Sequence, residues 1–164
     1  MNLDKYTLED LFLSAIKSEV ESNKLYLKLA KDIKNGLLQD KLEFLAKEEE
    51  KHKNFIEDAY LNHFPEKKII LPNKTPVPLP EVKIKDEDIP ISKVLKSAME
   101  AEMAAHDFYK NFAGRFESGT KLNHTLNYFS DMELGHYKLL EVEKESMERF
   151  EEADVYWPMV HVGP

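Results

Sequence analysis

Four stretches of the chain place apolar residues three and four positions apart, which is the spacing of one helix face. The first begins at Thr7, a favourable N-cap with Asp10 three residues on, and Gly36 is predicted to end it in the left-handed conformation. The second is predicted from about Leu38 to His63, and Pro65 ends it. Because the connection is short, these helices should form an antiparallel hairpin.

A second hairpin is predicted in the C-terminal half of the chain. Its helices run from about Ser92 to Phe116 and, after a cap at Thr120, as far as about Glu152. Residues 64–91 join the two hairpins and contain six prolines. A bundle with parallel second and third helices needs such a crossover, and an interdomain linker is the alternative. We therefore predict one all-α domain, a four-helix bundle over residues 1–152.

The last residues, 153–164, form an apolar tail with Val155, Tyr156, Trp157 and Met159. An exposed apolar segment of this kind is expected to cover another surface. We predict that the tail docks on the bundle or on the partner in a homodimer. His161 also lies in the tail, and the sequence indicates no role for it.

The two predicted hairpins are copies of one another, which indicates a structural repeat. Between Ala15 and Ala30, four residues are identical to those at an offset of 83, namely Ala15, Glu19, Tyr26 and Ala30 with Ala98, Glu102, Tyr109 and Ala113. Between Leu42 and Glu57, four residues are identical to those at an offset of 84, namely Leu42, Glu49, His52 and Glu57 with Leu126, Glu133, His136 and Glu141. Neither copy can bury its apolar face alone, so the two should pack together.

Six polar residues of this repeat lie on the apolar stripes and at similar distances from the hairpin turns, namely Glu19, Glu49, His52, Glu102, Glu133 and His136. Four ionised carboxylates are costly in a core, and no Lys or Arg on the stripes can pair with them. Two divalent cations would balance their charge. Imidazole with carboxylate suits iron, manganese or zinc. We predict a site for two metal ions, which could be iron, manganese or zinc.

Three further side chains lie close to these positions on the helical stripes. Tyr26 and Tyr109 each follow a repeated glutamate by seven residues. Each is either an aromatic residue of the core or a hydrogen-bond donor to a ligand of the site. His106, whose counterpart in the first half is Asn23, is an additional ligand, a partner of a ligand or a core histidine. The last two interpretations are favoured for His106.

Composition narrows the function further. The chain has 164 residues, a net charge of −8 and no cysteine, which excludes disulfides, cysteine-ligated metal centres and thiol catalysis. The acidic balance argues against nucleic-acid binding. The sequence has no apolar run long enough to span a membrane and no signal-peptide core at its start, so we expect no membrane partner and a cytoplasmic location.

The repeated motifs, Ala15-x3-Glu19-x6-Tyr26 with Glu49-x2-His52 and their second copies, resemble the rubrerythrin branch of the ferritin-like superfamily over residues 7–145. This resemblance implies a ferritin-like bundle with two bound iron ions. It implies that Glu19 and Glu102 are terminal ligands, that Glu49 and Glu133 bridge the ions, and that His52 and His136 each bind one ion.

The function that follows is a di-iron oxidoreductase that reacts with hydrogen peroxide or dioxygen in oxidative-stress defence, as a rubrerythrin-type peroxidase or a ferroxidase. Rubrerythrins proper carry a four-cysteine iron domain that delivers electrons, and this chain has no cysteine, so an external electron-donor protein is expected. They also carry an additional glutamate one turn after the third-helix ligand, where this chain has Ala105 and His106. The alternatives are an iron-handling ferroxidase and a non-catalytic metal-binding bundle.

Overall fold

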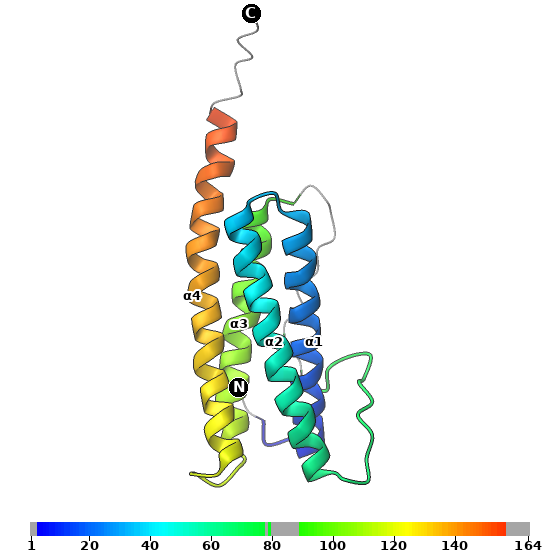
Figure 1. Cartoon of the computed structure of the whole chain (residues 1–164). Coiled ribbons are helices and arrows are strands. Elements are labelled where there is room, and N and C mark those ends of the chain that lie inside the picture. The colour runs from blue at the N-terminus through cyan, green and yellow to red at the C-terminus, as the bar shows by residue number, and fades with distance from the viewer. Residues whose placement is uncertain (1–2, 78, 80–88, 157–164) are drawn as a thin grey trace, which may run out of the picture.

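The computed structural model describes residues 3–77, 79 and 89–156, with backbone alone for 153–156. Within these residues the chain is all-α and has no strand, as predicted. Four helices form the bundle in Figure 1, namely α1 (Leu8–Asp32), α2 (Gly36–His63), α3 (Ile91–Ala113) and α4 (Lys121–Tyr156). In the described part of the chain, no helix is both long and apolar enough to cross a membrane.

Local capping starts α1 and α4 where the sequence predicts. The backbone N–H of Asp10 donates to Thr7 Oγ1 at 3.1 Å and that of Thr7 donates to Asp10 Oδ2 at 3.0 Å, which is a complete capping box. At the start of α4, the backbone N–H of Asn123 donates to Thr120 Oγ1 at 3.3 Å. Gly119 precedes this cap with a φ of +87°, a conformation that glycine adopts without a steric cost.

The predicted left-handed stop at Gly36 is wrong. The first helix already ends at Asp32, because Ile33 is extended, and Gly36 is instead the first residue of α2. The side chain of Asn35 accepts the backbone N–H of Leu38 at 3.2 Å and thereby caps α2. An extended connection with its own N-cap therefore replaces a glycine stop.

Helix α2 ends at His63 as predicted, while the ends of α3 and α4 differ from the sequence boundaries by a few residues. Helix α3 ends at Ala113 rather than Phe116, and α4 continues to Tyr156 rather than Glu152. The predicted tail from residue 157 onward, including His161, lies outside the described residues, and its docking stays a prediction. The start of α3 is tied to α4, because Glu151 Oε1 accepts the backbone N–H of Ser92 at 3.0 Å.

The two hairpins pack with α2 and α3 running in the same direction, so the chain crosses from one end of the bundle to the other between them (Figure 1). Helix α1 packs mainly on α2, and α3 mainly on α4. The crossover is anchored at Val77, which is fully buried and donates its backbone N–H to Ser14 Oγ at 3.1 Å.

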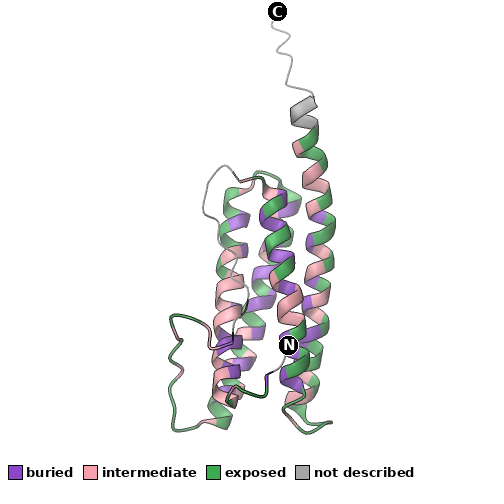
Figure 2. Cartoon of the chain, turned by 180° about the vertical axis from the view of Figure 1, so that it is seen from behind, coloured by how far each residue is buried: buried purple, intermediate pink, exposed green. Residues whose placement is uncertain are grey.

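The apolar core consists of two clusters, one toward each end of the bundle. The first contains Phe12, Tyr60 and Phe112, and the second contains Leu42, Leu95 and Leu140. Figure 2 shows that buried residues gather on the faces that the helices turn toward one another. The repeated polar residues lie on these same inward faces, with apolar packing on either side along the bundle.

Candidate metal centre

All four helices contribute to one buried polar cluster. Helices α1 and α3 each place a single glutamate in it, while α2 and α4 each place a glutamate and a histidine three residues apart, which share one helical face. None of these side chains is more than 4% exposed. The six-residue cluster therefore contains all the ligands that the sequence predicts, namely Glu19, Glu49, His52, Glu102, Glu133 and His136.

The geometry of the cluster follows the sequence repeat. His52 Nδ1 lies 2.9 Å from Glu133 Oε1, and His136 Nδ1 lies 3.1 Å from Glu49 Oε1. The distances to the single glutamates match as well, at 3.6 Å from His52 Nδ1 to Glu19 Oε2 and 3.7 Å from His136 Nδ1 to Glu102 Oε2. Each histidine thus lies close to the glutamate of the other half, and a pseudo-twofold relation connects the halves. His136 Nδ1 is equally close, at 3.1 Å, to Glu133 Oε2 of its own half.

Two overlapping sets of side chains in the cluster could each hold a metal ion. One set joins Glu19 and His52 to Glu49 and Glu133, and the other joins Glu102 and His136 to the same two glutamates. Within each set the donor atoms lie within 4.8 Å of one another. Because Glu49 and Glu133 belong to both sets, they are placed to contact two neighbouring ions.

The hydrogen bonding of these atoms fits a metal site. Among the described residues, the buried side-chain atoms that lack a hydrogen-bond partner are Glu49 Oε1, both ring nitrogens of His52, Glu133 Oε1 and His136 Nε2. The close contact between His52 and Glu133 does not have hydrogen-bond geometry, although its distance is short. Buried polar atoms are normally paired, so converging nitrogen and oxygen atoms without a hydrogen-bond partner are suited to bind a cation.

The pKa values show how strongly these groups affect one another without a metal. Burial, reinforced by repulsion from Glu49, raises the pKa of Glu19 and of Glu102 well above the usual range. Burial disfavours a charged His52, yet contacts with Glu133 and the other carboxylates raise its pKa to about 12. Although burial opposes ionisation, the histidines lower the pKa of Glu133. Protons thus stabilise the metal-free cluster.

Two buried tyrosines connect the halves around the cluster. The Tyr26 hydroxyl of α1 donates to Glu102 Oε1 on α3, and the Tyr109 hydroxyl of α3 donates to Glu19 Oε1 on α1. Burial, together with the neighbouring carboxylates, raises the pKa of both hydroxyls, so they remain protonated donors. Each tyrosine therefore orients the glutamate that belongs to the other half of the repeat.

His106 belongs to neither ligand set, and it contacts α4 instead. Its Nδ1 lies 2.7 Å from the backbone oxygen of Ser130 and 2.9 Å from the Ser130 hydroxyl, which donates to the backbone oxygen of His106 at 3.0 Å. In the first half, Asn23 Nδ2 makes the equivalent bond to the backbone oxygen of Ala46 at 2.7 Å. Ser130 was not predicted from the sequence, although its place one turn before Glu133 on an apolar stripe was a signal.

A four-helix bundle with a parallel second and third helix, and with buried carboxylates and histidines at its centre, defines the ferritin-like class of proteins. The family model for rubrerythrin matches residues 10–144, and the chain belongs to this family. Among solved structures, the chain is similar to the hypothetical protein Pfu-1136390-001 from Pyrococcus furiosus, with a TM-score of 0.81 and 29% identity over 91% of this chain and 95% of that chain. A comparison with curated proteins finds no match.

Proposed function

We propose that this protein is a di-iron carboxylate oxidoreductase that reduces hydrogen peroxide or dioxygen in oxidative-stress defence. One observation carries the proposal: the two ligand sets overlap at Glu49 and Glu133, and buried donor atoms in both sets lack a hydrogen-bond partner. Two separate structural sites would not need shared ligands. A shared pair instead holds two ions close enough to act on one substrate molecule.

Mixed imidazole and carboxylate donors suit iron, and two ferrous ions supply the two electrons that hydrogen peroxide needs. The balanced reaction converts one peroxide, two Fe(II) and two protons into two waters and two Fe(III). Glu49 and Glu133, which belong to both ligand sets, would hold the two ions. Tyr26 and Tyr109 keep the outer glutamates oriented through their hydrogen bonds.

The surrounding protein supports redox cycling in two further ways. The apolar clusters on both sides exclude water, which strengthens electrostatic interactions within the site. The four carboxylates balance two divalent ions, so the ferrous site carries no net charge into the core. Return of the iron to the ferrous state needs electrons from a separate donor protein, because the chain has no cysteine with which to bind an electron-transfer iron of its own.

Anaerobic loading with Fe(II), followed by a limiting amount of hydrogen peroxide, tests the proposal. The expected result is a rapid increase in Fe(III) absorption, with two iron ions oxidised for each peroxide. Glu49→Gln combined with Glu133→Gln should abolish this reaction. The matched control replaces another repeated pair on the same helices, Glu57 and Glu141, with glutamine and should react normally.

Two results would overturn the proposal. The first is iron that binds but is not oxidised by either peroxide or dioxygen. The second is tightly bound zinc in protein from the native source, with chelation causing unfolding and the double glutamine variant losing mainly thermal stability. That second result would indicate a structural metal bundle.

A further inference from the structure

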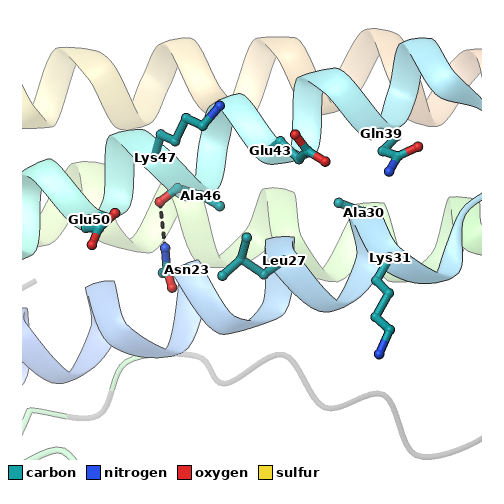
Figure 3. A pocket seen from close by; sticks show the side chains of 9 residues that line it. All are labelled: Asn23, Leu27, Ala30, Lys31, Gln39, Glu43, Ala46, Lys47 and Glu50. Atoms are coloured by element: carbon teal, nitrogen blue, oxygen red, sulfur yellow. Dashed lines mark hydrogen bonds between the residues drawn. The ribbon is translucent and has the colours of Figure 1, made fainter.

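A groove on the outer side of the bundle lies between α1 and α2, close to the metal cluster. It has a volume of about 450 Å³. Asn23 and Leu27 line its α1 side, while Glu43, Ala46, Lys47 and Glu50 are among the residues on its α2 side (Figure 3). The proposed function does not use this groove.

The floor of the groove is close to the cluster on both helices. Asn23 follows the ligand Glu19 by four residues, about 6 Å along α1, and Ala46 precedes the ligand Glu49 by three residues, about 4.5 Å along α2. Spacings of three and four residues keep these positions on the same helical faces as the ligands. The groove therefore leads toward the Glu19 side of the cluster.

One side-chain contact closes this floor. Asn23 Nδ2 donates to the backbone oxygen of Ala46 at 2.7 Å, as the dashed line in Figure 3 shows. Asn23 is partly exposed, and Ala46 contributes only a methyl group. A rotation of one amide side chain would therefore open the floor without moving a helix.

The equivalent place in the other hairpin has a larger side chain and more polar contacts. His106 and Ser130 replace Asn23 and Ala46 there, and three polar contacts connect them. Imidazole is larger than a carboxamide, and the serine hydroxyl fills space that Ala46 leaves open. The pseudo-twofold relation is therefore broken at this position, and the difference favours access from the α1–α2 side.

The charges around the groove indicate what passes through it. Lys31 and Lys47 are matched by Glu43 and Glu50, so the lining has no net charge with which to concentrate an ion. Its walls also offer the polar groups of Asn23 and Gln39 beside Leu27, whose exposed fraction is 50%. A small, neutral molecule fits this lining better than a metal cation does.

We propose that the groove between α1 and α2 is the entrance for the small neutral oxidant, hydrogen peroxide or dioxygen, and that Asn23 is the gate at its inner end. This inference rests on the proposed function for the identity of the oxidant. It also assigns a role to Asn23, whose side-chain amide donates to the backbone oxygen of Ala46 and lines the groove.

The absence of cysteine from the chain permits a direct test. Leu27→Cys places a unique thiol in the groove, and Lys110→Cys places one at the repeat-equivalent, exposed position on α3. Each variant is loaded with Fe(II) without oxygen and studied before and after alkylation with N-ethylmaleimide. Iron stoichiometry and helix content are measured in every sample, so that a slow reaction is not mistaken for unfolding.

Two rates are followed by stopped flow: oxidation of the iron by peroxide, and binding of nitric oxide, a neutral diatomic that reports access without turnover. Alkylation of Leu27→Cys should slow both by about tenfold or more, equivalent to at least about 1.4 kcal/mol of added barrier. Alkylated Lys110→Cys should react as before. Asn23→Ala, which removes the gate, should accelerate nitric oxide binding in the otherwise unmodified protein.

The outcomes separate this inference from the proposed function. The proposal that the groove is the entrance is overturned if alkylated Leu27→Cys reacts at unchanged rates. It is also overturned if both alkylated variants are slowed equally. Slower oxidation of the iron with unchanged nitric oxide binding also overturns it, because the groove then does not control the access of a small neutral molecule. If peroxide leaves the iron ferrous, the proposed function fails while nitric oxide binding still decides the entrance. A chain that binds no Fe(II) overturns both.

Discussion

Removing the hydroxyl of Tyr109 should weaken one metal position and spare the other. This hydroxyl donates to Glu19 Oε1 within the core, where water cannot readily replace it. Glu19 belongs only to the ligand set with His52, whereas Tyr26 serves Glu102 in the other set. Tyr109→Phe retains the ring and its packing, so the change is confined to the hydrogen bond.

The size of the effect follows from the type of bond that is lost. A hydrogen bond to a charged group contributes about 1.5–3 kcal/mol. Glu19 must be ionised to bind a metal, while the pKa that burial raises favours its protonated form in the free protein. Loss of the donor therefore acts on metal affinity. Changes to partners of metal ligands typically reduce affinity by about 10- to 100-fold, and we expect a decrease in this range.

An anaerobic titration of Fe(II) against a competing chromophoric chelator can resolve the two affinities. Tyr60→Phe is the matched control, because Tyr60 is equally buried but donates to Glu9, outside the cluster, at 3.0 Å. In double-mutant cycles, Tyr109→Phe should be non-additive with Glu19→Gln and additive with Glu102→Gln. Equal weakening of both metal positions, or a loss no larger than that of Tyr60→Phe, would refute the reasoning.

Three further expectations concern protons, metal and core packing. Lower pH should weaken metal binding, because four groups of the cluster have raised pKa values and their protons compete with the ions. Metal uptake should release as many as four protons per ion pair, measured with an indicator dye, and uptake without release would contradict this. Chelation should lower the melting temperature, since each site stabilises the fold by about 2.7 kcal/mol at a free metal concentration of about 100 Kd; calorimetry showing equal midpoints would oppose it. Phe112→Ala should reduce the free energy of unfolding by about 3–5 kcal/mol in urea, because Phe112 is fully buried and its ring centroid lies 5.1 Å from that of Phe12. The control Phe150→Ala, at a position that is 61% exposed, should change it by less than about 0.5 kcal/mol.

The helices could be predicted from the sequence, but not all of their ends could. The periodic stretches predict all four helices, because burial of one face requires a regular spacing of apolar residues. The capping box at Thr7 is likewise local and is present. The stop at Gly36 was wrong because two local signals compete there, and the side chain of Asn35 caps the next helix one residue earlier. The path of the chain between α1 and α2 decides which of the two signals is used.

The candidate metal site, too, could be predicted from the sequence only in part. Each Glu-x-x-His motif alone has little meaning, yet the repeat in register predicts that six polar side chains meet in the core, and the structure brings them together. His106 could not be assigned in this way, because its role depends on Ser130 of the neighbouring helix. The groove over Asn23 was also beyond the sequence, since it depends on how closely α1 and α2 pack.

The sequence alone establishes which residues share a helical face and at what height they lie, because both follow from the pitch of the helix and the length of each hairpin. It thereby selects the six residues of the cluster. Which side chains meet across the bundle follows from how the hairpins dock. Tyr109 reaches Glu19 and Tyr26 reaches Glu102, each in the other half, and each histidine faces the opposite motif. Lateral neighbours are set by packing between segments far apart in the chain, and residue spacing carries no information about them.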